Sequence, residues 1–333
     1  MDYKLIVGTD VSKDELDYCL VDSEMSLTEI QALEVSQVSN DVSSLAAWLS
    51  DYRGLSVHFV LEPTGSYSDK LMQLLSEYEL PFSLVNPHHS HHFSELLGVT
   101  SKNDRQAART LAYMGRRLEL GLATAPSKAI EGRKRILSAI YSLDKEIRRI
   151  SNHLHALAQY KDPTEVVISA YEEILTLIQE KKKGLETELK TLKDAEFDRL
   201  KKLAKSVKGV GEKTANWLLT ITDGLKGFDH EKQLIKFIGL APRSHRSGSS
   251  VRYRGGITKY GSAQTRACLY MGSISAIKHN KACKEQYERL RKRGKSHYSA
   301  MVAVMAKLLK QVFAVVKSEI PFDNDYYLRY KNC

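Results

Sequence analysis

Three carboxylates stand where a metal-dependent reaction on phosphate could be built. Asp10 ends the apolar run 4–10, Glu62 follows the apolar run 56–61, and Asp104 begins a helical pattern. Carboxylate oxygens are the ligands that Mg²⁺ prefers, and several are needed to offset the charge of two dications. Two such ions activate a nucleophile and stabilise the leaving oxygen at a phosphodiester. Asp10, Glu62 and Asp104 are therefore predicted as Mg²⁺ ligands.

The stretch SKNDRQAAR, residues 101–109, looks like a metal site with one ligand missing. In a helix, residues three positions apart lie on the same face, so residue 107 would stand beside Asp104. A carboxylate there would complete an Asp-x-x-Asp pair able to share metal ions. Ala107 has no atom that coordinates a metal. From spacing alone, the stretch is either ordinary helix or an active site with one ligand deleted.

Residues 206–219, SVKGVGEKTANWLL, predict two helices joined by a glycine-containing hairpin. Gly209 and Gly211 permit a sharp turn, and the N-terminus of the second helix could then hold a phosphate. Lys208 and Lys213 would add positive charge without base specificity. The alternative is a tight turn between helices that binds nothing.

The segment 241–261 combines serines with cations. A serine hydroxyl is a poor nucleophile unless its proton is removed and the developing charge is stabilised, and guanidinium groups serve the second need at a phosphate. Taken alone, these residues predict a flexible phosphate-binding loop and leave a nucleophilic Ser247 open. The candidate phosphate contacts are Arg243, Arg246, Arg252, Arg254 and Lys259.

The elements that must position these residues form three predicted regions. Residues 1–125 alternate short apolar runs with helical patterns, which predicts a mixed α/β sheet with helices on its faces and with strands 4–10 and 16–22 antiparallel. Residues 126–195 predict two long amphipathic helices, either an antiparallel coiled coil or oligomerisation arm, or a helical bundle without a partner. Residues 196–333 predict a separate, mainly helical domain.

Charge separates the last region from the rest. Residues 196–333 hold 28 Lys and Arg against 11 Asp and Glu, whereas residues 1–195 hold 22 against 29. A basic region of this kind indicates a polyanion partner. Four scattered cysteines without a CxxC pair, and a start without a signal-peptide pattern, predict a reducing, cytoplasmic setting. The apolar segment 301–316 is predicted as an amphipathic or core helix, too short to span a bilayer.

Six motifs taken together resemble those of the DEDD-type transposases of insertion-sequence family 110, including its 1111 branch, and of the related Piv-type DNA invertases. The resemblance runs along nearly the whole chain. The motifs are GTDVSKDELD (8–17), LEPTGSY (61–67), VNP (85–87), KNDRQAAR (102–109), GVGEKTA (209–215) and GLAPRSHRSGSSVR (239–252).

The resemblance implies more than the composition does. It implies an RNase H-like (RuvC-type) domain over 1–125, a coiled-coil segment over 126–195 and a serine-bearing transposase domain over 196–333, in which the residue pattern at 206–219 is that of a helix–hairpin–helix. Asp10, Glu62 and Asp104 match the family's Mg²⁺-binding carboxylates, and Ser247 matches the serine that becomes linked to DNA. The family pattern Lys-x-Asp-x-x-Asp-Ala-Arg has its last Asp where this chain has Ala107.

The resemblance thus predicts a DNA recombinase that acts on donor and target DNA, is guided by a structured bridge RNA, and assembles from dimers into tetramers. It predicts that Ala107 impairs catalysis in this copy while leaving fold and nucleic-acid binding intact. Two other readings remain. One is a metal-only RuvC-like nuclease or junction resolvase, in which water attacks, and the other is a nucleic-acid-binding protein without catalysis.

Overall fold

The computed structural model describes residues 3–22, 25–26, 32–99, 103–161, 164–247 and 251–325, except for the side chains of 244–247 and 251–255. The chain forms two compact units, an N-terminal unit, Met1–Pro126, and a C-terminal unit, Ser127–Cys333. The predicted division into 1–125, 126–195 and 196–333 stays a prediction.

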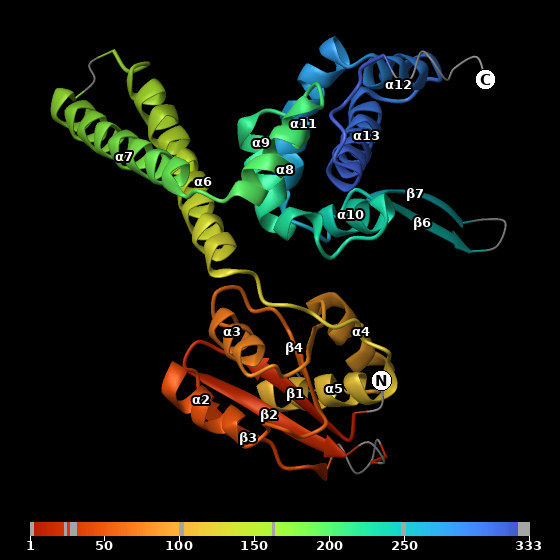
Figure 1. The fold of residues 1–333 in the computed structure, drawn as a ribbon. Coiled ribbons are helices and arrows are strands. Elements are labelled where there is room, and N and C mark those ends of the chain that lie inside the picture. The colour runs from red at the N-terminus through yellow and green to blue at the C-terminus, as the bar shows by residue number, and fades with distance from the viewer. Residues whose placement is uncertain are drawn as a thin grey trace. The chain divides into compact units, whose positions relative to one another are not determined.

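A five-stranded mixed sheet forms the centre of the N-terminal unit (Figure 1). Its order is β3-β2-β1-β4-β5, with β1 antiparallel to β2 and parallel to β4. This confirms the predicted mixed α/β sheet and the antiparallel first pair. The strands are β1 (Leu5–Val11), β2 (Glu15–Asp22), β3 (Ser36–Ser39), β4 (Val57–Leu61) and β5 (Phe82–Leu84).

Helices cover both faces of this sheet. Because side chains alternate along a strand, Val7 and Phe59 face one side while Ile6 and Val60 face the other. The first side packs against α2 (Val42–Ser50) and α3 (Asp69–Glu77), and the second against α5 (Asp104–Arg117). Helix α4 (Pro87–Leu96) lies beside α5.

Gly8 brings α5 unusually close to β1. A Cβ atom at this position would lie 2.1 Å from the Ala112 nitrogen and 2.2 Å from the Ala108 carbonyl oxygen. Only a glycine permits such an approach of two backbones. The position of α5 against β1 is therefore set by this contact.

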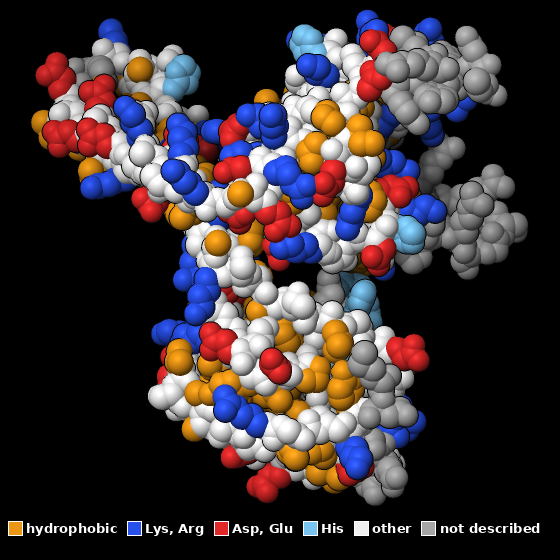
Figure 2. All heavy atoms as spheres, in the orientation of Figure 1, with side chains coloured by type: hydrophobic (Ala, Val, Ile, Leu, Met, Phe, Trp, Pro, Cys, Tyr) orange, Lys and Arg blue, Asp and Glu red, His pale blue; other side chains and the backbone are white. Residues whose placement is uncertain are grey.

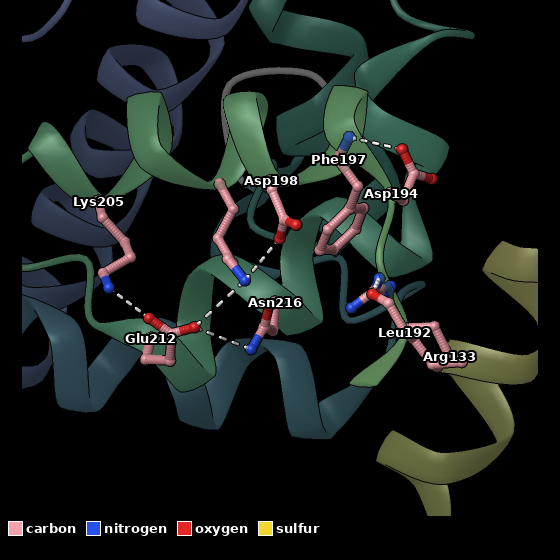
Figure 3. Close-up of polar contacts among 9 residues, drawn as sticks. Arg133, Leu192, Asp194, Phe197, Asp198, Lys205, Glu212 and Asn216 are labelled. Carbon is pink, nitrogen blue, oxygen red and sulfur yellow. Dashed lines mark hydrogen bonds and ion pairs between the residues drawn. The ribbon is translucent and has the colours of Figure 1, made fainter. Parts of the chain in front are cut away.

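The C-terminal unit begins with two long helices, α6 (Lys128–Leu157) and α7 (Glu165–Thr191), which pack against each other (Figure 1). The two predicted helices are confirmed, while a coiled coil or an oligomerisation arm stays a prediction. Arg133 joins their base to α8 (Ala195–Ser206): its Nη2 donates to the Leu192 carbonyl at 2.8 Å and its guanidinium lies 4.0 Å from the centre of the Phe197 ring (Figure 3).

The remaining elements pack around α13 (His297–Ser318), whose Val304, Leu308 and Val312 are fully buried. Within the described residues, α13 is the one helix with the length and apolar composition of a membrane span, and half of that window is buried inside the protein. It is longer than the predicted segment 301–316 and serves as a core helix. The others are α9 (Glu212–Ile221), η1 (Asp223–Leu225), α10 (Glu231–Ile238), β6 (Pro242–Ser247), β7 (Val251–Ile257), α11 (Ala263–His279) and α12 (Lys281–Lys292).

The prediction of a loop over residues 241–261 is wrong for most of that range. Its backbone forms an antiparallel two-stranded sheet, β6 with β7, in the register Arg246↔Arg252 and Ser247↔Val251. Glycine and serine content suggested a loop, but backbone hydrogen bonds between two short strands satisfy the same polar groups.

Candidate active site and nucleic-acid interface

Asp10 and Glu62 lie at the same end of the sheet. Strands β1 and β4 are parallel with Thr9 opposite Leu61, so the next residues, Asp10 and Glu62, follow at the carboxyl ends of both strands. Alternation places both on the face that packs against α5, because Ile6 and Val60 contact that helix.

Asp104 is the first residue of α5. The helix begins there because the Asn103 side chain caps it, accepting a hydrogen bond from the Gln106 nitrogen at 2.8 Å. Gly8 holds α5 against β1 one turn further along, at Ala108. The three predicted carboxylates are thus brought toward one end of the sheet, with Asp104 exposed and Asp10 and Glu62 half-buried.

The pKa of Asp10 reflects the nearby carboxylates. Burial, followed in order of importance by the charges of Asp104, Glu62 and Asp17, raises the pKa of Asp10 from 3.8 to about 6. Neighbouring carboxylates that raise the pKa of Asp10 in this way create a negative potential around it. A bound cation would relieve that repulsion.

Stability of the N-terminal unit is expected to depend on pH through Asp10 when divalent cations are removed. The folded protein keeps this proton up to pH about 6, whereas the unfolded chain releases it near 3.8. The contribution is therefore complete below pH 3.8 and is lost as the pH rises through 6. As the pH rises through this range, the denaturant midpoint of the wild-type protein should decrease relative to that of Asp10→Asn, because only the wild type loses the Asp10 contribution. Equal slopes in both proteins would contradict the assignment.

Ala107 lines the same cavity as Glu62. The cavity has a volume of about 180 Å³ and lies between α4, α5 and the end of β4. The Ser90 hydroxyl holds Glu62 by donating to its Oε2 at 3.1 Å. A longer side chain at position 107 would enter the space beside Glu62. The other lining residues are Pro87, His91, Ser94, Glu95, Val99, Asn103, Gln106 and Thr110.

Asp17 is a fourth carboxylate near Asp10 that the sequence analysis did not single out. It lies directly opposite Asp10 in the antiparallel pair, and opposite residues share a face of the sheet. Asp17 is only 6% exposed, and its Oδ1 accepts a hydrogen bond from the Gln37 amide at 3.1 Å. Pairing of the two predicted strands could have revealed it once their register was known.

The side chains at this site are of the type that binds Mg²⁺, but too few of them are grouped together to hold the ion. Carboxylate oxygens at Asp10, Glu62 and Asp104 are the hard ligands that Mg²⁺ takes. Among the residues that the structure describes, however, no three His, Cys, Asp or Glu side chains are grouped closely enough to hold a metal ion. The position that could add a ligand beside Glu62 is occupied by Ala107.

The predicted glycine hairpin joins α8 to α9. Gly209 has a left-handed φ of +106°, and a Cβ there would lie 2.6 Å from the Ala276 Cβ, so both conformation and packing against α11 require glycine. Gly211 caps α9 without a side-chain hydrogen bond, and Lys208 and Lys213 are exposed beside it. Phosphate binding at this turn stays a prediction.

Glu212, the first residue of α9, already attracts two lysines (Figure 3). Its carboxylate accepts a hydrogen bond from Lys205, and its Oε1 lies 3.5 Å from the Lys201 Nζ. The Lys205 hydrogen bond is the main reason that the pKa of Glu212 is lowered. The Glu212 carboxylate and the two lysines form a network of ion pairs at the start of α9. A phosphate bound at this helix end would have to fit into that network.

The candidate nucleophile ends a strand of the C-terminal unit. Ser247 is the last residue of β6, beside the opposed pair Arg246 and Arg252, and Arg254 pairs with Ser244. The side chains of these residues lie outside the described part of the structure. Arg243 is exposed at the opposite end of the same sheet, and Lys259 is exposed just after the end of β7.

A cationic corner between α12 and α13 was not predicted as a separate site. Arg289, Arg291, Lys292, Arg293 and Lys295 are all exposed there. Tyr298, 62% exposed, follows them, and its ring centre lies 6.4 Å from that of Tyr270. Aromatic rings beside cations suit single-stranded nucleic acid. The signal in the sequence is the run RLRKRGK (289–295). On the face shown in Figure 2, Lys and Arg side chains are interspersed with Asp and Glu.

Comparison with known proteins gives the family. Residues 7–161 match a DEDD-type IS110 transposase domain, and residues 201–288 match the domain described as "Transposase IS116/IS110/IS902 family". The chain is 26% identical over 326 residues to the pilin gene-inverting protein of Moraxella lacunata, covering 96% of this chain and 98% of the relative. The pilin gene-inverting protein of Moraxella bovis is equally similar.

A second kind of relative is a transposase. The transposase for insertion sequence element IS1111A of Coxiella burnetii is 23% identical over 301 residues, covering 83% of this chain and 79% of the relative. The two matched domains and these relatives agree with the motifs on which the resemblance was based. This chain carries the domains of the IS110 family of transposases and is similar to proteins named as a pilin gene-inverting protein and as an IS1111A transposase.

Proposed function

We propose that this protein is a DNA transposase or site-specific recombinase that cuts and joins strands through Ser247. The observation that carries the proposal is the convergence of Asp10, Glu62 and Asp104 at one end of the sheet, within a chain that has both domains of the family. The substrate class, donor and target DNA, follows from the relatives. The scattered cysteines support a cytoplasmic location for this activity.

Each residue has a role in the proposed reaction. The Ser247 oxygen loses its proton to solvent and attacks the phosphorus of a phosphodiester, so that a serine–phosphate bond forms, the bond from phosphorus to a deoxyribose oxygen breaks, and that oxygen leaves as a hydroxyl after taking up a proton. Mg²⁺ held by Asp10, Glu62 and Asp104 would assist by stabilising the charge that develops on the oxygens. Arg243, Arg246, Arg252, Arg254 and Lys259 bind phosphates of the DNA, and Lys208, Gly209, Gly211 and Lys213 hold its backbone.

A guide RNA and an assembly of dimers into tetramers belong to the same proposal. The basic composition of residues 196–333 supports a nucleic-acid partner without distinguishing RNA from DNA. Sequencing of RNA that copurifies with the protein addresses the guide. An enriched structured RNA from the flanking DNA supports it, and its absence in an active preparation removes it.

Ala107 favours a second candidate, a nucleic-acid-binding protein whose chemistry is weak or lost. Ala107 lines the cavity beside Glu62 and stands where the family pattern has a carboxylate. Binding requires only the basic surfaces, which the substitution does not touch. The two candidates bind the same partners and differ in whether the bound DNA is cut and joined.

Replacing Ser247 tests the proposed nucleophile. In an Ala107→Asp background supplied with its element ends and Mg²⁺, Ser247→Ala should reduce denaturant-resistant protein–DNA adduct and recombinant product by at least about 1,000-fold. Ser249→Ala, a nearby serine in the same segment, is the matched control and should retain both. Strand cleavage that survives in Ser247→Ala without adduct would instead establish a metal-only nuclease or resolvase.

A further inference from the structure

A cavity with a mostly apolar lining lies in the C-terminal unit, where the base of the α6–α7 pair meets α8, α9 and α11. We call it the hairpin-base pocket. Its volume is about 330 Å³, at the lower end of the ~300–1,000 Å³ typical of small-ligand pockets. It is lined by Arg133, Leu137, Ile140, Tyr141, Asp144, Glu186, Leu189, Lys190, Lys201, Glu212, Lys213, Asn216, Trp217, Gln264 and Cys268.

Two aromatic rings line this pocket in a fixed arrangement. The ring centres of Tyr141 and Trp217 are 6.4 Å apart with the planes tilted by 34°. The indole nitrogen of Trp217 donates to the Thr265 hydroxyl at 2.8 Å, which holds the ring in place. Leu137 and Ile140 add apolar surface next to them. Such walls favour a flat, apolar-faced group.

Two amides supply polar contacts to the same pocket. Asn216 is only 7% exposed, and its Nδ2 donates to Glu212 at 3.5 Å (Figure 3). Within the described residues, the buried Asn216 Oδ1 has no hydrogen-bond partner. Gln264 offers a second amide from α11. An amide both donates and accepts hydrogen bonds, as the edge of a nucleobase requires.

The charges around the pocket argue against a small free anion as its ligand. Its four cations, Arg133, Lys190, Lys201 and Lys213, are nearly balanced by the carboxylates of Asp144, Glu186 and Glu212. Lys201 lies 3.5 Å from Glu212, and Lys213 lies 3.9 Å from Asp144. A purely apolar ligand would leave the two amides without partners. A neutral ring with a polar edge satisfies both conditions.

The pocket also adjoins the predicted phosphate-binding turn. Lys213 and Glu212 line the pocket and belong to the first turn of α9, directly after Gly211. A nucleic-acid backbone held at Gly209–Gly211 would therefore pass within one or two residues of the pocket entrance. An unpaired base on that backbone can turn into it, as bases do in enzymes that take a nucleotide out of its stack.

We propose that the hairpin-base pocket receives one unpaired nucleobase of the bound nucleic acid. This inference rests on the proposed function, because it assumes that the glycine turn binds a nucleic-acid backbone. It assigns Tyr141 and Trp217 as the stacking surface, and Asn216 and Gln264 as the groups that contact the edge of the base.

The test compares a strand with bases to a strand without them. The full-length protein is titrated at fixed salt with a fluorescent oligothymidine of about 15 nucleotides, and with an abasic deoxyribose-phosphate strand of equal length. The wild-type protein should bind the base-bearing strand about tenfold more tightly, since stacking of a base is a substantial part of single-strand affinity. Tyr141→Ala and Gln264→Ala should lose that preference and keep their affinity for the abasic strand.

Matched variants separate the pocket from other aromatic surfaces. Tyr141→Phe keeps the ring and should keep the preference, as should Tyr160→Ala, which removes an exposed tyrosine outside the pocket. Thermal unfolding followed by circular dichroism checks that each variant is folded. Should Tyr141→Ala misfold, Gln264→Ala still decides the question.

The outcomes distinguish this inference from the proposed function. If both pocket variants retain the base preference, or if Tyr298→Ala alone removes it, the pocket does not hold a base although nucleic-acid binding stands. If the wild-type protein binds neither strand, the proposed function fails and the pocket assignment fails with it.

Discussion

Replacing Ala107 by Asp is expected to raise the rate of DNA strand cleavage and joining by at least about 100-fold in the presence of Mg²⁺. Ala107 lies one turn after Asp104 and lines the cavity that contains Glu62, so a carboxylate there enters the candidate metal site. The measurement is the rate at which denaturant-resistant protein–DNA adduct accumulates on the protein's own element ends.

Ala107→Asn is the control for this change. It has nearly the same size and shape as the Asp variant but no charge, so it fills the cavity without offsetting a dication. Rates that rise equally in both variants would show that packing is responsible, and unchanged rates in both would show that three carboxylates already suffice or that the chemistry lies elsewhere.

The same substitution can also be tested by measuring the stability of the protein. Without metal, an added carboxylate should destabilise the N-terminal unit, because it joins a group of charges that already raises the pKa of Asp10. Mg²⁺ should then raise the melting temperature of the Ala107→Asp protein more than that of the wild type, since a ligand stabilises the state that binds it. Equal shifts in the two proteins would argue against a metal site at this position.

Gly8→Ala is expected to destabilise the N-terminal unit by about 3 kcal/mol. A methyl group there would lie 2.1 Å from the Ala112 nitrogen and 2.2 Å from the Ala108 carbonyl oxygen, and both are backbone atoms that cannot rotate away. Helix α5 has to shift off β1 to accept it. Denaturant-induced unfolding, followed by far-ultraviolet circular dichroism, measures the loss.

Gly121→Ala provides the control within the same unit. A Cβ at Gly121 meets no atom within 4 Å, so this variant should unfold close to the wild type. The shift of α5 in Gly8→Ala also carries Asp104 away from Asp10, so the pKa of Asp10, followed by NMR, should fall toward its usual value. A Gly8→Ala protein with unchanged stability would show that the two backbones are not in contact.

Local patterns in the sequence were sufficient for the order of elements and for part of the candidate site. Alternating apolar runs predicted the mixed sheet, and the ends of those runs placed Asp10 and Glu62 where parallel strands β1 and β4 finish together. The spacing from Asp104 placed Ala107 on the same helical face, because a helix repeats every few residues regardless of what surrounds it. The family was also evident from motifs, each of which is a short, local string.

Long-range pairing was decided only by the tertiary structure. The register of β1 against β2 sets Asp17 opposite Asp10, and no periodicity within either strand contains that information. The same holds for β6 and β7, whose composition suggested a loop. The hairpin-base pocket needs residues from five helices, so it exists only after these helices have packed. Spacing along the chain thus determined which faces carry which groups, while the contacts between faces, made by residues far apart in sequence, determined which groups meet.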